Sequence, residues 1–275
     1  DDNAKALQLK SGELDLALLT PKDAATFTED EAYTCYDMKT SDYRGILFNF
    51  WNEYWQENRD LIPAVCYAMD RESIINAVLL GQGMPAYGPL QRNIYNNEDV
   101  EHYDYDPEKA KAVLEEAGWT DSDGDGIREK DGQKLSIRWL TYPSRQELPL
   151  LAESAQSTLK DIGIDVQINA TADHITICKD PTAWDVYVGA NVNCGLGDPT
   201  NFFSTHCLDA STKNRGQYHS DELEKLAVKL NSTFDVTERN QIAIEMQQQL
   251  LDDNAFVFCS FLKMSMISQA NVTGL

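Results

Sequence analysis

The stretch that decides the fold runs from residue 105 to residue 141 and reads YDPEKAKAVLEEAGWTDSDGDGIREKDGQKLSIRWLT. Asp106 can accept hydrogen bonds from the first-turn N–H groups of a helix, Pro107 suits the first helical position, and Gly118 suits the left-handed residue that ends it. Three Asp-Gly turn signals follow. Apolar residues then alternate with polar ones, as in a strand with one buried face, at positions 135, 137 and 139. The stretch therefore predicts a helix, a hairpin and a strand.

Helices and strands alternate outward from this stretch in both directions. Helical periodicity with capping residues predicts helices at 3–11, 59–69, 71–80, 146–162, 220–230 and 235–251. Apolar runs and alternation predict strands at 14–19, 33–36, 46–50, 164–168, 185–189 and 256–261. Irregular segments are expected at 81–104 and 191–218. The alternation indicates α/β layers rather than a bundle or a sandwich.

Length and charge limit the classes of partner. The chain has 275 residues and a formal net charge of -22, which repels phosphate backbones and anionic lipids, so we expect no nucleic-acid partner and no binding to a membrane surface. No apolar run approaches the length of a membrane span, and the first residues have no signal-peptide pattern. Because there is no initiator Met, we expect a processed form or a fragment.

An acidic loop is the first candidate metal site. Asp121, Asp123 and Asp125 alternate with other residues, and oxygen ligands at every second position can converge on calcium. The EF-hand pattern is incomplete, because Ile127 follows the glycine directly and Gly132 stands where a bidentate Glu is required. The alternatives are a calcium-stabilised module and a hairpin whose Asp side chains bond their own turns.

The six cysteines form no Cys-x-x-Cys pair. Cys66 and Cys259 lie in apolar segments and are expected to be buried thiols. His206 stands beside Cys207, and Cys194 lies thirteen residues before Cys207, which leaves three readings. They are a zinc or nickel site, a disulfide between Cys194 and Cys207, and unpaired thiols.

Signatures of an enzyme are missing from the sequence. There is no Gly-x-Ser-x-Gly, Ser-x-x-Lys, Walker loop or Gly-x-Gly-x-x-Gly pattern, so we expect a protein that is not an enzyme. A hydrolase that uses His206 or His219 as base is the remaining alternative. Irregular segments this long usually serve binding, and 191–218 is rich in groups that can contact a ligand.

Several motifs, taken in order, carry a resemblance to a known family. They are Lys10-Ser-Gly-Glu-Leu-Asp15, Phe48-Asn49, Ala68-Met69-Asp70-Arg71, Gly81-Gln-Gly-Met-Pro85-Ala-Tyr-Gly-Pro89, the stretch 105–135, Gly163-Ile-Asp165-Val, and Gly197-Asp198-Pro199 with Phe202-Phe203. These motifs span nearly the whole chain. In them the chain resembles the extracytoplasmic solute-binding proteins of peptide and nickel ABC transporters, family 5.

The resemblance implies a two-lobed, hinged binding protein of the type II periplasmic-binding-protein fold, with a mixed sheet flanked by helices. The chain would be its C-terminal lobe: 1–42 a remnant of the N-terminal lobe and hinge, 43–268 the ligand-binding lobe, and 269–275 a return strand toward the hinge. Expected partners are a peptide or small-molecule ligand and ABC permease subunits. We expect a monomer outside the cytoplasm, in the periplasm or lipid-anchored at the outer face of the membrane.

The same resemblance suggests where the ligand binds and what it is. We expect ligand contacts from Asn49, Trp51, Asn193, Asp198, His206, Arg215 and Tyr218. Peptide-binding members usually carry an Asp four residues before the Pro of the Asp-Pro pair, and this chain has Gly195 at that position. Nickel-type members often carry a Trp six residues before the same Pro, and this chain has Asn193 there. The segment from Tyr142 to Arg145 resembles the nickel or metallophore branch. Expected ligands are therefore a nickel chelate or metallophore, with nickel as part of the ligand and no resident cofactor, or a short peptide.

Overall fold

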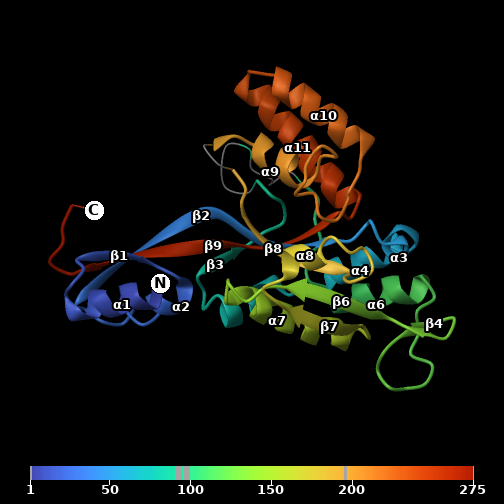
Figure 1. Cartoon of the computed structure of the whole chain (residues 1–275), viewed down its shortest axis with the longest axis horizontal. Coiled ribbons are helices and arrows are strands. Elements are labelled where there is room, and N and C mark those ends of the chain that lie inside the picture. Colours follow the sequence, from blue (N-terminus) through green and yellow to red (C-terminus); the bar gives the residue numbers. More distant parts are fainter. Residues whose placement is uncertain (1, 91–94, 96–99, 195–196, 275) are drawn as a thin grey trace.

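The computed structural model describes residues 2–90, 95, 100–194 and 197–274, and within them the chain is built on a seven-stranded mixed sheet (Figure 1). Along the sheet the strands are ordered β1 (Leu16–Leu19), β9 (Phe256–Gln269), β2 (Tyr33–Phe48), β8 (Val186–Val192), β6 (Ser136–Thr141) and β7 (Asp165–Ala170), and β3 (Gly83–Pro85) pairs with β9. β6 is parallel to β7 and to β8, and the other pairs are antiparallel. The predicted α/β fold with a mixed sheet is confirmed.

The decisive stretch folds as its sequence predicts. In α6 (Pro107–Glu116), the Asp106 side chain accepts a hydrogen bond of 2.9 Å from the Lys109 N–H, and Gly118 takes a φ of +86° just beyond the helix. A two-stranded hairpin, β4 (Glu129–Lys130) and β5 (Gln133–Lys134), leads into β6. The caps and turns therefore fix these boundaries locally.

Two long strands connect a small N-terminal unit to the main body (Figure 1). Beside β1, α1 (Asp2–Ser11) and α2 (Pro21–Ala24) enclose a separate small core made of Ala6, Leu9, Ala17, Leu19, Ala24, Phe27 and Ile267. β2 is one strand of 16 residues, so the expectation of two separate strands at 33–36 and 46–50 is wrong. Its middle is polar and irregular: Thr40 Oγ1 donates to the Leu262 carbonyl and accepts from the Asp42 N–H where the register with β9 shifts.

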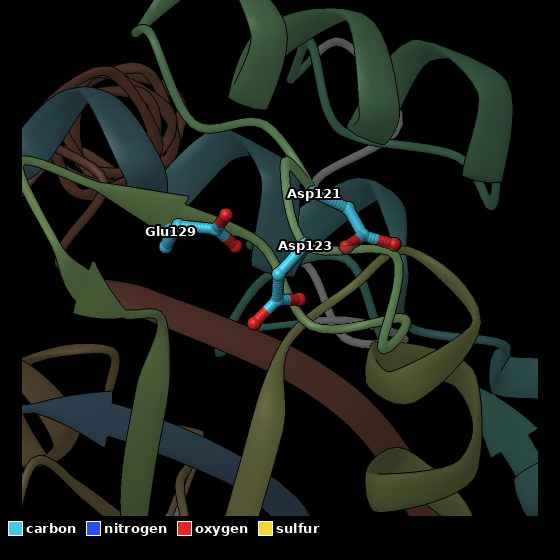
Figure 2. Close-up of side chains that lie close together, drawn as sticks. All are labelled: Asp121, Asp123 and Glu129. Carbon is cyan, nitrogen blue, oxygen red and sulfur yellow. The ribbon is translucent and has the colours of Figure 1, made fainter.

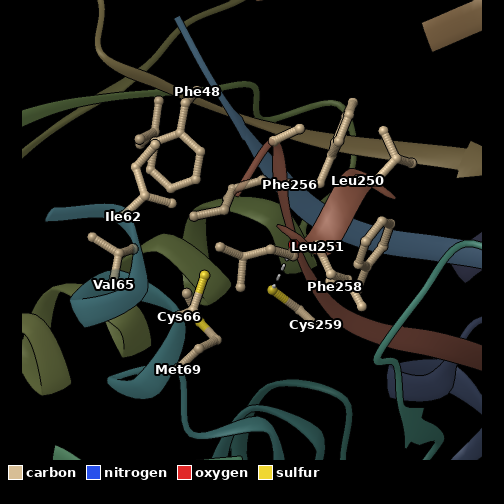
Figure 3. Packing of buried hydrophobic residues seen from close by; sticks show 14 of the residues in the cluster. Phe48, Ile62, Val65, Cys66, Met69, Leu250, Leu251, Phe256, Phe258 and Cys259 are labelled. Carbon is tan, nitrogen blue, oxygen red and sulfur yellow. Dashed lines mark hydrogen bonds between the residues drawn. The ribbon is translucent and has the colours of Figure 1, made fainter. Parts of the chain in front are cut away.

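The main core lies between the sheet and its helices. β2, β9 and α4 (Ile62–Tyr67) meet there, and Figure 3 shows Phe48, Cys66, Phe256 and Cys259 packed together. Cys66 and Cys259 are buried free thiols, as predicted. The remaining helices are α3 (Glu53–Glu57), a 3₁₀ turn (Arg59–Leu61), α5 (Arg71–Ser73), a π-helical segment (Ile74–Val78), α7 (Glu147–Asp161), α8 (His174–Ile177), α10 (Asp221–Ser232) and α11 (Val236–Asp252). None of the helices in the described part of the chain combines the length and apolar character that a membrane span requires.

Two other expectations about secondary structure are wrong. The segment 191–218 is not irregular throughout, because α9 (Thr200–His206) forms inside it with Phe202 and Phe203 packed into the main core. β9 continues to Gln269, so the strand expected at 256–261 is too short. The domain boundaries proposed at 42 and 268 remain a prediction.

Leucines on two faces of α7 allow the core to be tested within one helix. Leu159 is 0% exposed and Leu150 is 47% exposed. Leu159→Ala is expected to lower the free energy of unfolding by about 2–5 kcal/mol, because it removes buried methyl groups and leaves a cavity. Leu150→Ala is expected to change it by less than about 0.5 kcal/mol. Urea unfolding followed by circular dichroism measures both, and equal losses would contradict the burial described here.

Candidate functional site

The candidate site lies at the carboxyl edge of the parallel strands β6, β7 and β8. Tyr142 follows β6 directly, His174 begins α8 shortly after β7, and Asn193 follows β8. In open α/β sheets, ligands bind at this edge, because the connecting loops diverge there and leave a crevice. The residues that follow β6 and β7 are therefore delivered to one region, close to the first residues of β8, because Leu140 of β6 pairs with Tyr187.

Three aromatic rings form a stack at this edge, made of Tyr142, His174 and Tyr187. The centroids of Tyr142 and His174 lie 4.1 Å apart with 20° between the planes, and those of His174 and Tyr187 lie 5.8 Å apart with 6° between the planes. His174 Nδ1 lies 2.9 Å from the Tyr187 hydroxyl oxygen, within hydrogen-bond distance. The imidazole is therefore held by one ring contact and one polar contact.

Arg215 adds a positive charge to the aromatic stack, with its guanidinium 5.3 Å from the centroid of the Tyr187 ring. The turn that carries Arg215 is fixed on both sides. Asn214 is 5% exposed, and its amide bonds both the N–H and the carbonyl of Tyr218. Gly216 lies so close to the sheet that a Cβ there would stand 2.2 Å from the Phe48 carbonyl oxygen. The backbone position of Arg215 is thus set by packing.

The site combines uncharged rings with a permanent cation. Burial lowers the pKa of His174, and the Arg215 charge lowers it further, so the imidazole is neutral at pH 7. Burial raises the pKa of Tyr187 above its ordinary value, although Arg215 opposes the shift. The pKa of Tyr142 is raised mainly by burial.

A buried ion-pair network borders the aromatic stack. Arg44 is 1% exposed and lies between two carboxylates, with Nη1 2.7 Å from Asp42 Oδ1 and Nη2 2.7 Å from Glu147 Oε1. Arg145 Nη1 lies 3.8 Å from the other Asp42 oxygen, and its side chain is 44% exposed. The network ties β2 to the first turn of α7, and so it fixes the α7 end of the segment that carries Tyr142 and Arg145.

The predicted ligand contacts fall into separate groups. The Asn49 N–H donates to the Asp185 carbonyl at the start of β8, whereas Asn193 follows the end of β8. Eight strand residues span about 26 Å, so Asn49 and its neighbour Trp51 do not share a site with Asn193. The Asn49 amide donates to the carbonyls of Pro181 and Trp184, which is a structural role.

Three of the predicted contacts hold the fold together. Asn193 is 1% exposed, and its amide donates to the Pro89 carbonyl. Asp198 Oδ1 accepts from the N–H and the hydroxyl of Thr200 at the start of α9. Tyr218 is buried in the main core, and its hydroxyl donates to Asp253 Oδ2. Gly195 lies outside the described residues.

His206 is the second predicted residue near Arg215, but the thiols beside it are not joined. Burial above all, with the charges of Arg215 and Lys213, lowers the pKa of His206 to about 4. Cys194 and Cys207 are free thiols, which agrees with the reading of unpaired thiols and not with the disulfide. Cys207 is buried in the core, and the Cys194 thiol donates to the Asp198 carbonyl instead.

The acidic loop differs from its prediction. Among the described residues, one group of three His, Cys, Asp or Glu side chains has ligand atoms within 4.8 Å of one another, and it consists of Asp121, Asp123 and Glu129 (Figure 2). Asp125 does not join it, because it is paired with Lys134, which also lies 3.0 Å from Asp123. Both Asp121 oxygens accept from backbone N–H groups within the loop. The three aspartates are therefore already satisfied by the turn and by a lysine, whereas Glu129 Oε2 is buried without a hydrogen-bond partner.

Sequence reasoning found part of this site. It placed Arg215 and His206 in a binding segment, and it noted the segment from Tyr142 to Arg145 as a family feature. It missed His174 and Tyr187, since Tyr187 reads as an ordinary buried strand residue and His174 belongs to no motif. Their contact depends on strand pairing, which no local pattern reveals.

Comparison with known proteins identifies the architecture. The model of a family described as Bacterial extracellular solute-binding proteins, family 5 Middle, matches residues 1–214. The oligopeptide-binding protein AppA of Bacillus subtilis is 28% identical over an alignment that covers 100% of this chain and 51% of AppA. The structure of NikZ from Campylobacter jejuni in complex with Ni(L-His) has a TM-score of 0.84 and 26% identity, and the match covers 100% of this chain and 56% of NikZ. The structure of AppA from Bacillus subtilis in complex with a nonapeptide has a TM-score of 0.82 and 26% identity, with 100% and 55% covered.

These matches confirm the expected type II periplasmic-binding-protein fold. The chain spans about half the length of the relatives it matches.

The lowered pKa of His206 predicts a loss of stability in acid. The unfolded chain binds a proton on this imidazole near pH 6.5, whereas the folded chain binds it only near pH 4, so the contribution is complete above pH 6.5 and is lost as pH falls toward 4. Between pH 7 and pH 5 the loss is expected to be about 2 kcal/mol. Urea unfolding at both pH values should show that His206→Gln removes this loss. His219→Gln should keep the loss, because Asp209 raises the pKa of His219; identical behaviour of the two variants would contradict the assignment.

The pairing of Lys134 predicts how the acidic loop responds to calcium. Calcium at millimolar concentration is expected to leave the Tm unchanged, because Lys134 already neutralises Asp123 and Asp125. Lys134→Met removes the competing cation, and calcium should then raise the Tm in differential scanning calorimetry. Lys225→Met on α10 is the control and should behave like the unmodified chain. A rise in Tm without any substitution would instead make the loop a calcium site.

Proposed function

The chain belongs to the bacterial extracellular solute-binding proteins, family 5, and from this membership we propose that it serves an ABC importer as part of the solute-binding component. In this proposal the protein is a monomer outside the cytoplasm, in the periplasm or held by a lipid anchor, and it delivers its ligand to the permease subunits. Binding takes place between two lobes whose closure the ligand stabilises. Membership of a family of binding proteins supports the expectation that the chain is not an enzyme.

The observation that carries the proposal is the concentration of cations at the carboxyl edge of β6 to β8. The whole chain has 23 Lys and Arg against 45 Asp and Glu. At this edge, however, Arg145 and Arg215 both lie close enough to Tyr142 for their charges to lower its pKa. Low-dielectric surroundings strengthen the attraction of such charges for anions. A ligand that carries carboxylates is therefore favoured at this edge.

Among carboxylate ligands we favour a metal chelate, such as a nickel complex of an amino acid or a metallophore, over a short peptide. The equal identity of 26% to NikZ and to AppA does not separate the two classes. The site itself offers a neutral imidazole beside the cations, and the sequence has Gly195 where peptide-binding members usually carry an Asp for the α-amino group. A short peptide remains the alternative.

Arg215 provides the test of the proposed function. Arg215→Ala is expected to weaken binding of nickel(II)–L-histidine by about tenfold to a hundredfold, because a charged hydrogen bond contributes about 1.5–3 kcal/mol. Arg59→Ala is the matched control, since its guanidinium also lies over a ring, that of Phe50, which packs in the main core and not with Tyr187. Isothermal titration calorimetry of the protein at its natural length, with nickel–histidine and with peptides of two to six residues, measures both effects. If neither ligand class binds, or if Arg59→Ala weakens binding as much, the proposal is wrong.

A further inference from the structure

We infer that Asp42 is a positioning residue that limits the affinity of the ligand site, because it holds the Arg145 guanidinium in a contact that a ligand carboxylate must replace. The inference rests on the proposed function and deepens it, since it names the residue that competes with the ligand. The geometry that carries it is the loose contact of 3.8 Å between Arg145 Nη1 and Asp42 Oδ2, next to the tight pairing of Asp42 with Arg44.

Asp42 is the fixed partner in this contact. Its backbone pairs with Val192 of β8, and its N–H donates to Thr40 Oγ1 at 3.0 Å. Its carboxylate accepts from Arg44 Nη1 at 2.7 Å, and Arg44 is itself 1% exposed. Because the backbone and the side chain of Asp42 are both bonded, its carboxylate stays in place when Arg145 moves.

Arg145 is the movable partner. It lies in the turn between β6 and α7, where its carbonyl accepts from the Leu148 N–H at 3.1 Å, so its backbone is fixed at the start of the helix. Its side chain is 44% exposed, and the contact of 3.8 Å with Asp42 is longer than a hydrogen bond. A half-exposed pair of this kind contributes little free energy, so the guanidinium can turn to another acceptor at low cost.

A ligand carboxylate at the aromatic stack can compete with Asp42 for this guanidinium. The Arg145 charge already acts on Tyr142 of the stack, whose pKa it lowers. A carboxylate there can accept two parallel hydrogen bonds of about 2.7–2.9 Å from the guanidinium, which are stronger than a contact of 3.8 Å. Arg145 is therefore expected to move from Asp42 to the ligand when the ligand binds.

This transfer has a cost that limits affinity. Without Arg145, the two carboxylates of Asp42 and Glu147 are left with the single guanidinium of Arg44, so one negative charge is uncompensated beside the bound anion. Like charges repel, and Asp42 attracts Arg145 again as soon as the ligand moves away. In the proposed function the ligand must leave for the permease, and a competitor built into the site favours that release.

Two nickel complexes and two variants test the competition. Nickel(II)–L-histidine carries a carboxylate, and nickel(II)–L-histidinamide has an amide in its place. Asp42→Asn keeps an oxygen that can accept from Arg44, but it removes the charge that holds Arg145. Asp37→Asn is the matched control, because Asp37 lies on the same strand, is bonded by the Ser265 hydroxyl, and belongs to the part of β2 that pairs with β9 and not with β8.

Isothermal titration calorimetry of the protein at its natural length measures the effect, with the Tm of each variant as a check on folding. Asp42→Asn is expected to bind nickel(II)–L-histidine about threefold to fivefold more tightly, because the competing ion pair is lost. It should gain nothing with nickel(II)–L-histidinamide, and Asp37→Asn should match the unmodified protein with both complexes. Damage to the structure would weaken binding, so a gain in affinity separates this role from a structural one.

A double-mutant cycle shows whether the gain depends on Arg145. In a protein that already carries Arg145→Gln, adding Asp42→Asn should give no further gain, because no guanidinium is left to release.

A second measurement needs no ligand. Phenylglyoxal modifies the deprotonated guanidinium, and a neighbouring carboxylate keeps the guanidinium protonated. Mass spectrometry should therefore find that Asp42→Asn speeds the modification of Arg145 by about the same factor as it raises affinity. Arg59, whose guanidinium lies over Phe50, is the internal control and should react at an unchanged rate.

The inference is wrong if Asp42→Asn binds nickel(II)–L-histidine no more tightly than the unmodified protein, if the gain persists without Arg145, or if Arg145 reacts no faster. Binding that still falls with Arg215→Ala would then leave the proposed function intact. If peptides of two to six residues bind instead of the nickel complex, the same comparison between their free acids and their C-terminal amides decides. If neither ligand class binds the unmodified protein, the proposed function fails and the inference fails with it.

Discussion

The pairing of β2 with β8 is the constraint on which the rest of the structure depends. Seven antiparallel pairs run from Asp42 opposite Val192 to Phe48 opposite Val186. This register brings Arg44 to the carboxyl edge, where Glu147 of α7 can reach it, and sends Asn49 to the other end of β8. A shift of one residue would turn every side chain of β2 to the opposite face and separate both contacts. Which residues can share a site is therefore decided by backbone hydrogen bonds before any ligand binds.

Much of the fold was predictable because its signals are local. A cap such as Asp106 or a terminating glycine such as Gly118 acts on N–H and carbonyl groups within a few residues, so the sequence alone contains the cause. The middle of β2 contains no such signal. Its polar residues pair with two neighbouring strands that come more than 140 residues later in the chain, and those partners keep it extended. α9 was missed for a related reason, since packing of Phe202 and Phe203 into the core stabilises a helix of only 7 residues.

Residues of the site could be predicted only where they belong to one continuous segment of the chain. Arg215 could be named because residues 191–218 are long and rich in polar groups, although several of those groups, such as Asn193 and Tyr218, turn out to hold the fold. His174 and Tyr187 come from different elements and meet only when β8 pairs with β6. The acidic loop at residues 121–125 was the first candidate metal site in the sequence. Its aspartates, however, accept hydrogen bonds from the backbone of the loop and pair with Lys134. A segment rich in ligand-type residues is thus weaker evidence for a binding site than side chains that meet in the folded chain.

The electrostatics of the site make sense only when each cation is assigned its role. Arg44 is buried between two carboxylates that neutralise its charge. Its function is therefore to hold β2 against α7. Arg215 faces a ring instead of a carboxylate, and a cation–π contact neutralises none of its charge. The second cation at this edge, Arg145, is only loosely paired, at 3.8 Å from an Asp42 that is already bonded to Arg44. Arg44 and Arg145 together balance the charges of Asp42 and Glu147. Arg215 is therefore the guanidinium of this group whose charge is left to attract an external carboxylate.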